Sequence, residues 1–235
     1  MNRVLANLQQ VKERIAEACL RRGRSTDEVK ILAVTKTHPP EVVDLAIAAG
    51  VDAIGENRVQ EAAGKKPLVV HPAPWHLVGT LQRNKARKAL EIFDLIATVD
   101  RVNLATTLER LQAEKGQVLP VMVEVNLGEE PQKGGVLPRA LLPLAEHLLS
   151  SCPHLQLAGL LTVPPYDPDP RRSRPFFQQL RKLAEQLQRD LGLAKLELSM
   201  GMSDDYPIAV EEGASWVRLG RALFGERGES TPVTT

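Results

Sequence analysis

Short apolar runs alternate with amphipathic stretches along almost the whole chain. After a leading amphipathic segment, residues 1–20, eight runs have the length and aliphatic content of β-strands. They cover residues 30–36, 51–56, 75–79, 94–100, 120–127, 156–163, 195–200 and 216–220. This alternation is typical of parallel strands joined by helical crossovers.

Two of the crossover segments carry clear start and stop signals. One begins at Pro39-Pro40 and ends at Gly50, which places proline inside the start of a helix and glycine past its end. The other starts from Ser173 and ends at Gly192. Its apolar face consists of Phe176, Phe177, Leu180, Leu183, Ala184 and Leu187.

Eight parallel strands with intervening helices predict a single (β/α)8 TIM barrel with an extra N-terminal helix. The 235 residues match that architecture and are short for two independent domains. An open doubly wound sheet is the competing architecture, because periodicity alone does not tell whether the strands close. We expect one barrel domain over residues 1–227 and a polar, disordered tail over residues 228–235.

Charge and composition narrow the function classes. With 30 Lys plus Arg against 29 Asp plus Glu, no global field favours a nucleic acid or a membrane as partner. No run approaches the roughly 20 apolar residues needed to span a bilayer, and the N-terminus does not resemble a signal peptide, so we expect a cytoplasmic protein. Cys19 and Cys152 are interpreted as packing residues. The scattered histidines and cysteines predict no metal site.

Candidate chemistry lies near the two ends of the chain. Lys36 ends an apolar strand, and an amine held in a partly desolvated place loses its proton readily and can form an imine with a carbonyl. The segment LSMGMSDDYPIAVEEGASWVRLGRALFG adds the hydroxyls of Ser199 and Ser203 and the cation Arg218. Near Gly220 backbone amides can approach an anion at the start of a helix. This pattern indicates a site for a phosphorylated carbonyl cofactor at the C-terminal ends of barrel strands.

Each candidate also has a plain structural interpretation. An isolated strand-end lysine such as Lys36 most often extends its amine into solvent. Arg218 could pair with a barrel carboxylate, either Glu56 or Glu124. The two serines could serve as loop or capping residues. Met200 and its neighbour Met202 are expected to pack.

Long ordered segments of the chain resemble the pyridoxal phosphate homeostasis proteins, which are single-domain barrels similar to the N-terminal domain of alanine racemase. The matching segments cover nearly the whole chain. They are AVTKTHPPEVVDLAIAAGVDAIGENRVQE, WHLVGTLQRNK, EVNLGEEPQKGGV, GLLTVPPY, SRPFFQQLRKL and LSMGMSDDYPIAVEEGASWVRLGRALFG.

The resemblance implies a role for each of the site residues. Lys36 would form a Schiff base with pyridoxal 5′-phosphate, and Asn57 would lie beside the ring. Arg218 would lie near the pyridine nitrogen, with a contact to the phosphate as the alternative. The residues implied to surround the phosphate are Ser199, Ser203, Gly220 and Arg221. The expected cofactor-binding set also includes Met200.

We expect a non-enzymatic role in binding, buffering or delivering pyridoxal phosphate, with effects on vitamin B6 and amino-acid balance. The alternative is an amino-acid racemase-like enzyme, which needs a second base. The internal candidates for that base are Tyr166, Tyr206 and His76, and all three are interpreted as structural. PLP-dependent apoenzymes are the expected acceptors, and the protein is expected to be a monomer.

A third class, a nucleic-acid or regulatory binding protein, is suggested by a short basic cluster. Its members are Arg83, Lys85, Arg87 and Lys88. At a net charge of +1 a solvated helix face explains the cluster better.

Overall fold

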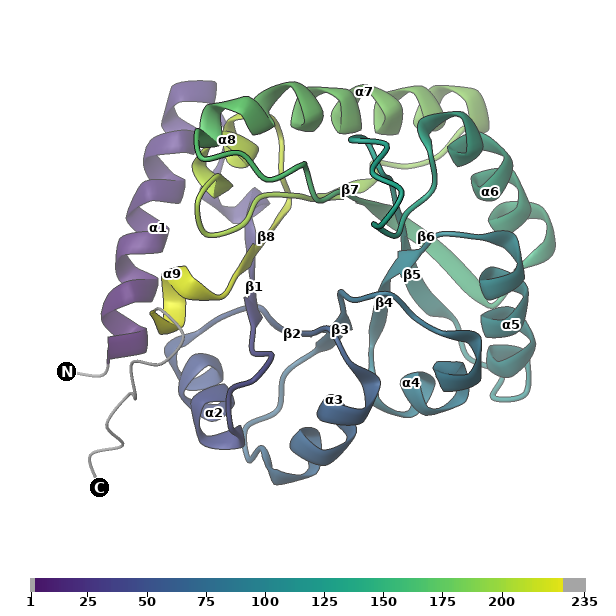
Figure 1. Cartoon of the computed structure of the whole chain (residues 1–235), viewed down its shortest axis with the longest axis horizontal. Coiled ribbons are helices and arrows are strands. Elements are labelled where there is room, and N and C mark those ends of the chain that lie inside the picture. The colour runs from purple at the N-terminus through teal and green to yellow at the C-terminus, as the bar shows by residue number, and fades with distance from the viewer. Residues whose placement is uncertain (1–2, 226–235) are drawn as a thin grey trace.

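Strands β1 to β8 pair in sequence order, and β8 pairs with β1, in this computed structural model, which describes residues 3–225 (Figure 1). Every pair is parallel. The strands are β1 (Lys30–Val34), β2 (Ala53–Glu56), β3 (Trp75–Leu77), β4 (Leu95–Val99), β5 (Leu119–Glu124), β6 (Leu155–Leu161), β7 (Glu197–Ser199) and β8 (Trp216–Leu219).

Helices surround this barrel (Figure 1). They are α1 (Arg3–Arg22), α2 (Pro40–Ala49), α3 (Val59–Lys65), α4 (Ala86–Ile92), α5 (Val102–Ala113), α6 (Pro138–Ser151), α7 (Arg174–Leu191), α8 (Tyr206–Glu211) and α9 (Arg221–Phe224). Short 3₁₀ turns lie at Thr26–Glu28, Lys66–Leu68, Arg83–Lys85 and Pro170–Ser173. The predicted TIM barrel with an extra N-terminal helix is therefore confirmed, and the open sheet is excluded by the closure. The expected disordered tail, residues 228–235, lies outside the described residues.

The helix signals in the sequence mark the observed ends closely. Gly50 and Gly192 follow α2 and α7 with φ angles of 92° and 63°, in the left-handed region that glycine adopts without strain. One detail differs. Ser173 precedes α7, but its hydroxyl donates to the carbonyl of Pro170 at 2.5 Å instead of capping the helix. The preceding 3₁₀ turn supplies this competing acceptor.

Hydrophobic side chains pack on both faces of the strands. One cluster lies between strands and helices and includes Trp75 and Phe177, both buried. Two-sided burial explains why the strands appear in the sequence as continuous apolar runs. Cys19 and Cys152 are buried and free, so their predicted packing role is confirmed. A smaller cluster inside the barrel contains Leu32, Ala53, Leu95, Ala97, Met122, Leu161 and Trp216.

Polar and aromatic side chains close the N-terminal end of the barrel. His76 in β3 packs edge-on against Trp216 in β8, with ring centroids 4.9 Å apart. The indole nitrogen of Trp216 donates to Glu197 Oε2 at 2.6 Å, and Lys30 Nζ donates to Glu197 Oε1 at 2.8 Å. Lys30, Glu197 and Trp216 are the first residues of their strands. Ligand access is therefore left to the opposite end of the barrel.

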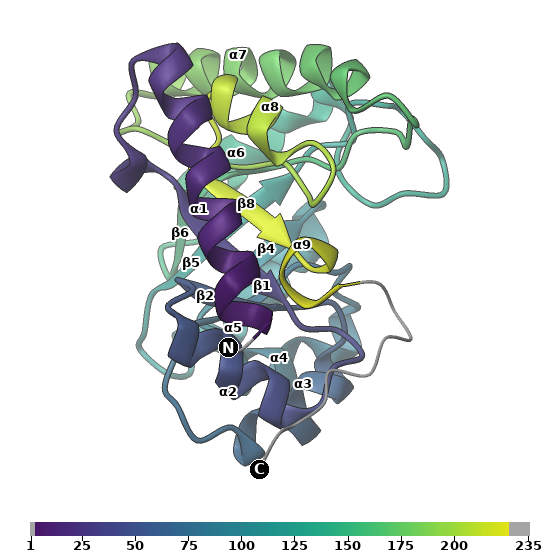
Figure 2. The same cartoon turned by 90° about the vertical axis from the view of Figure 1, so that its left-hand side faces the viewer.

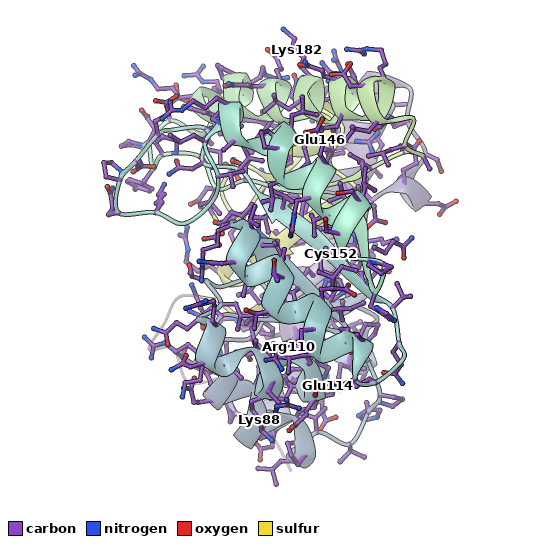
Figure 3. The ribbon with its side chains drawn as sticks, turned by 90° about the vertical axis from the view of Figure 1, so that its right-hand side faces the viewer. Lys88, Arg110, Glu114, Glu146, Cys152 and Lys182 are labelled. Carbon is purple, nitrogen blue, oxygen red and sulfur yellow. The ribbon has the colours of Figure 1, made fainter. Side chains whose placement is uncertain are left out.

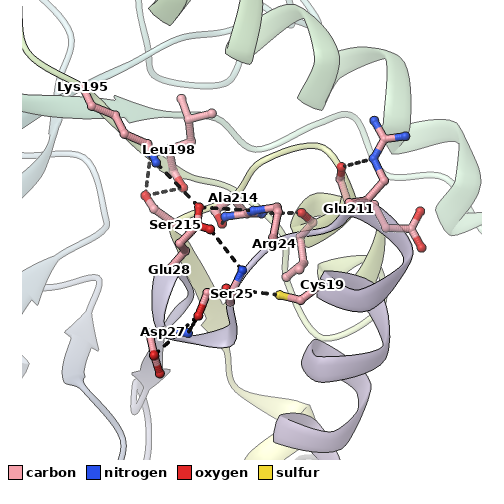
Figure 4. A network of polar contacts seen from close by, with 12 residues as sticks. Cys19, Arg24, Ser25, Asp27, Glu28, Lys195, Leu198, Glu211, Ala214 and Ser215 are labelled. Atoms are coloured by element: carbon pink, nitrogen blue, oxygen red, sulfur yellow. Dashed lines mark hydrogen bonds and ion pairs between the residues drawn. The ribbon is translucent and has the colours of Figure 1, made fainter.

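Helix α1 runs along one side of the barrel beside α8 and α9 (Figure 2). The segment after α1 ties it to the end of α8. Arg24 donates to the carbonyl oxygens of Val210 at 2.5 Å and Ala214 at 2.9 Å (Figure 4). These bonds satisfy one carbonyl in the last turn of α8 and one just after the helix, where a cation is favourable. The N-terminal helix thus supports the strand pair that closes the barrel.

Charged side chains on α4 and after α5 pair with one another on the outer surface. Arg87 Nη2 lies 3.0 Å from Glu114 Oε2, and Lys88 Nζ lies 2.8 Å from Glu91 Oε2. Figure 3 shows Lys88, Arg110 and Glu114 on this outer face. Exposed pairs of this kind contribute little to stability. They support the interpretation of the basic cluster as solvated surface.

In the described part of the chain, no helix combines the length and the apolar character that crossing a membrane requires.

The floor of the barrel predicts a pH-dependent stability. Burial lowers the pKa of His76 from 6.5 to about 4, so the unfolded chain binds more protons between these values. The contribution of His76 to stability is therefore lost as the pH falls through this window, by about 2 kcal/mol between pH 7 and pH 5. Urea unfolding of the wild type and of His76→Leu at both pH values measures this. Between pH 7 and pH 5 the free energy of unfolding of the variant should fall by about 2 kcal/mol less than that of the wild type. An equal fall in both proteins would contradict the prediction.

Candidate functional site

The C-terminal ends of the strands bring most predicted site residues to one mouth of the barrel. Lys36 follows β1 and Asn57 follows β2, while Ser199 ends β7 and Gly220 follows β8. Closure makes β1 and β8 neighbours, with Leu32 opposite Arg218 in the register. Residues almost two hundred positions apart in the sequence therefore belong to adjacent strand ends.

Lys36 is exposed, two residues beyond the end of β1. Leu32 belongs to the cluster inside the barrel, and Val34 shares its face, because a Cβ placed on Gly55 of β2 would lie 2.8 Å from Leu32 and 3.4 Å from Val34. Alternation along the strand carries this inner face up to Lys36 at the mouth. The expectation that the core partly desolvates the amine is wrong, since Lys36 lies beyond the end of the strand and is exposed.

The residue after Lys36 has an unusual backbone. Thr37 has a φ angle of 68°, and among the described non-glycine residues only Glu129 shares a positive value. A β-branched residue in this region carries a strain of about 1–3 kcal/mol, which the surroundings must impose. Outliers of this kind cluster at functional sites.

Arg218 is the buried cation of the site, with 5% of its surface exposed. Its guanidinium donates to Ser199 Oγ at 3.0 Å and to the carbonyl of Thr162 at 2.8 Å. Burial lowers the pKa of Arg218 to about 10, while Glu124 and Asp205 act in the opposite direction. The group stays protonated at neutral pH, so the mouth of the barrel holds a fixed positive charge.

Of the two carboxylates expected to pair with Arg218, Glu124 is the one that interacts with it electrostatically, although the hydrogen bonds of Arg218 go to Ser199 and Thr162. Burial raises the pKa of Glu124 to about 6, and Arg218 partly offsets that rise. One carboxylate oxygen of Glu124 is buried with no hydrogen-bond partner in the described part of the protein. Glu56 was the wrong candidate, because it lies in a separate network with Thr35 and Lys65. Its position on β2 turns it away from the barrel interior.

The serine-rich turn after β7 depends on one glycine. Gly201 has a φ angle of 90°, and a Cβ there would lie 2.5 Å from Ala209 Cβ. Asp205 accepts the amide of Met202 at 2.7 Å, which closes the turn. Ser203 follows, and its hydroxyl accepts the amide of Ala222 in α9 at 3.1 Å. The turn and α9 are thereby held together beside the mouth.

The remaining predicted site residues differ in their burial and in their contacts. Met200 is fully buried in the core, which agrees with a packing role, and its place among the cofactor residues stays a prediction. Gly220 precedes α9 and lies next to β1, where a Cβ would be 3.5 Å from the carbonyl oxygen of Val34. The side chain of Arg221 pairs with Asp204. Only the backbone of these last two positions was expected to meet an anion.

A hollow of about 430 Å³ adjoins Asn57, lined also by Arg58, Gly79, Thr80 and Lys85. The side-chain oxygen of Asn57 is buried and has no hydrogen-bond partner in the region the structure describes. Gly79 is required here, since a Cβ would lie 2.2 Å from the carbonyl oxygen of Asn57. The ends of β2 and β3 therefore approach closely beside an unpartnered acceptor.

The three candidates for a second base are poorly placed for that role. Tyr206 is buried, with the guanidinium of Arg14 5.3 Å from its ring centre. His76 lies in the floor network at the far end of the barrel. Tyr166 is 86% exposed in the loop after β6. Within residues 3–225, no group of three His, Cys, Asp or Glu side chains could hold a metal ion.

Comparison with known proteins decides the family. The sequence profile of the alanine racemase N-terminal domain matches residues 3–228. The pyridoxal phosphate homeostasis protein of Aquifex aeolicus is 43% identical over 94% of this chain and 96% of its own length. That of Pseudomonas aeruginosa is 39% identical over both full lengths. The chain belongs to the pyridoxal phosphate homeostasis protein family.

Solved structures agree with this family assignment. The structure of PipY from Synechococcus elongatus with PLP bound is 40% identical, with a TM-score of 0.80, and covers 92% of this chain and all of its own. An alanine racemase from Clostridium difficile shares the fold at 14% identity, with a TM-score of 0.75. That enzyme is longer, since the match covers 62% of its chain.

Sequence reasoning missed the residues that support Lys36 from outside the barrel. The buried Lys65 and Glu56 form a network with the partly exposed Glu61 behind the Lys36 turn. The spacing of Glu61 and Lys65 is that of an ordinary helix surface pair, which carries no sign of burial. Only the pairing of β1 with β2 and the packing of α3 bring these groups together.

The turn after β7 predicts a strong requirement for glycine. Gly201→Ala should lower the free energy of unfolding by about 3 kcal/mol, because it adds both backbone strain and a steric clash. Gly192→Ala is the matched control, since its φ is 63° but nothing lies within 4 Å of the added carbon. It should cost about 1 kcal/mol. Urea unfolding of both variants measures the difference, and equal losses would contradict this account of the turn.

Glu124 predicts the opposite pH effect to His76. Burial raises the pKa of its carboxyl from 4.5 to about 6, so the folded protein binds more protons in this window and stability falls as the pH rises through it. Glu124→Gln removes that cost and should raise the free energy of unfolding at pH 7 by about 2 kcal/mol. The gain should vanish at pH 4. Denaturant titrations at the two pH values test this, and a gain of equal size at pH 4 would contradict it.

Proposed function

We propose that this protein binds pyridoxal 5′-phosphate as a Schiff base on Lys36 and buffers or delivers it in the cytoplasm. The observation that carries the proposal is the 40% identity, over almost the whole chain, to a barrel with PLP bound. PLP-dependent apoenzymes are the acceptors we propose.

The donor set at the mouth fits a phosphorylated aldehyde. Lys36 offers an accessible amine, and Ser203 offers a hydroxyl beside the start of α9. The buried side-chain oxygen of Asn57 has no hydrogen-bond partner among the described residues, so it could accept a hydrogen bond from a ligand group at the end of β2. Arg218 supplies a buried positive charge close to Ser199. Amine, hydroxyls and cation together suit a ligand with a carbonyl at one end and an anion at the other.

We assign each group a part in holding the cofactor. When bound, the cofactor supplies an aldehyde that condenses with an amine and a ring that withdraws electrons. Lys36 would provide the amine, while Ser199, Ser203 and the backbone of Gly220 and Arg221 would hold the phosphate. Arg218 would lie near the pyridine nitrogen and, being charged at neutral pH, would disfavour protonation there.

The same arrangement argues for a carrier rather than a racemase. A charged guanidinium at the ring nitrogen weakens the electron sink that amino-acid chemistry uses. Racemisation also needs a base on each face of the ring. The buried Tyr206, the floor residue His76 and the exposed Tyr166 do not supply a pre-positioned second base.

Chemical trapping tests the assignment of Lys36. Purified protein is incubated with PLP, reduced with borohydride and mapped by peptide mass spectrometry. We expect one reduced adduct on Lys36, none on that peptide in Lys36→Ala, and wild-type labelling in Lys182→Ala, which removes an exposed lysine of α7. Adducts spread over surface lysines, unchanged in Lys36→Ala, would contradict the proposal.

The carrier role has its own test with the same proteins. The PLP-loaded wild type should show no racemisation of amino acids and no exchange of the α-proton with solvent. Activity that is abolished in Lys36→Ala would instead support an amino-acid racemase-like enzyme. Transfer of PLP to an apoenzyme, followed by its recovered activity, measures delivery.

A further inference from the structure

Lys65, the last residue of α3, is a buried cation with all of its hydrogen-bonding capacity used. Its side chain is 6% exposed. Nζ donates to Glu56 Oε1 at 2.6 Å, to the carbonyl of Thr35 at 2.8 Å and to Glu61 Oε1 at 2.9 Å. An ammonium group has three protons to donate, so these three acceptors satisfy it completely.

The network forms hydrogen bonds with the residues on both sides of Lys36. On one side Thr35 accepts from Lys65 through its carbonyl, and its hydroxyl donates to Glu56 Oε1 at 2.7 Å. On the other side the amide of Thr37 donates to Glu61 Oε1 at 2.5 Å. Lys36 is therefore the central residue of a turn whose two flanking residues are both held by the same cluster.

The hydrogen bond from the amide of Thr37 to Glu61 explains the unusual backbone of that residue. Its left-handed backbone persists only where the surroundings impose it. The Glu61 carboxylate holds the amide of Thr37, and Lys65 in turn holds Glu61. The strain is thus stored in the residue next to Lys36 and maintained from outside the barrel.

Stability alone is a weak reason to bury this cluster. Replacing a buried ion pair by apolar residues of similar volume is often neutral or stabilising. A buried pair that specifies one backbone conformation has a clearer purpose, and here that conformation belongs to Thr37, the residue next to Lys36.

We infer that Lys65 is a positioning residue, which acts through Glu56 and Glu61 to hold the Lys36 turn in the conformation that accepts the cofactor. The inference rests on the proposed function of Lys36 but assigns a role to residues outside the mouth. Lys65 and Glu61 do not touch the cofactor in this account.

The test compares PLP loading in variants of the two side chains. Absorbance titration measures the apparent dissociation constant, and borohydride mapping measures the adduct on Lys36. Glu61→Ala and Lys65→Met should weaken loading about tenfold, equal to about 1.4 kcal/mol. Glu61→Gln keeps an oxygen that accepts the amide of Thr37, so its loading should stay at the wild-type value. Lys66→Met is the matched control, because its ammonium bonds to the carbonyl of Ile92 instead.

A second substitution separates positioning from plain stability. Thr37→Gly lets residue 37 adopt a positive φ without strain. In the Glu61→Ala background it should restore loading to near the wild-type value, although it restores no contact that stabilises the fold. Thermal unfolding of each protein is followed alongside.

The outcomes separate the two proposals. Wild-type loading in both Glu61→Ala and Lys65→Met, with only the melting temperature lowered, would show that the cluster is structural and overturn the inference. Weakened loading that Thr37→Gly does not restore would also overturn it. If Lys65→Met fails to fold, Glu61→Ala alone and in combination with Thr37→Gly still tests the inference, because Glu61 is partly exposed. Absence of any Lys36 adduct in the wild type overturns the proposed function itself, and the inference with it.

Discussion

The pairing of β8 with β1 is the interaction on which the rest of the site depends. It closes the sheet and sets the register that places Leu32 opposite Arg218. Through this one seam the strand that leads to Lys36 lies beside the strand that leads to Gly220. Helix α1 supports the seam from outside by packing against α8 and α9. Without closure, the amine and the anion-facing segment would lie on opposite edges of a sheet.

Two buried polar clusters flank that seam and differ in what they do. Arg218 lies inside the barrel, where Glu124 and Asp205 partly offset the effect of burial on its pKa. Lys65 lies outside the barrel, and its ammonium group donates all three of its hydrogen bonds to acceptors of the protein. The inner cation bonds to Ser199 and to the carbonyl of Thr162 at the strand ends, and the outer one bonds to the backbone of Thr35 and to two carboxylates. Together they determine the polarity and the shape of one opening.

How much the sequence predicted depended on the range of the interaction. The glycines at Gly50 and Gly192 end their helices as expected, because a helix stop is a local event. The expected partial desolvation of Lys36 was wrong, and its exposure agrees with the alternative of a strand-end lysine that extends into solvent. Glu56 was offered as a partner of Arg218, but strand alternation turns it to the other face. Lys65 carried no sequence signal, since its partners come from three separate segments.

The sequence by itself determined the order and kind of the elements, and therefore the parallel barrel, because apolar periodicity and helix end signals are local. It also determined the family, and with it the expectation for Lys36. The tertiary structure alone decided which polar side chains are buried together. Pairing β1 with β2 and β8 joins residues that no local pattern relates, and the energetics of a buried charge depend on every neighbour that this pairing brings.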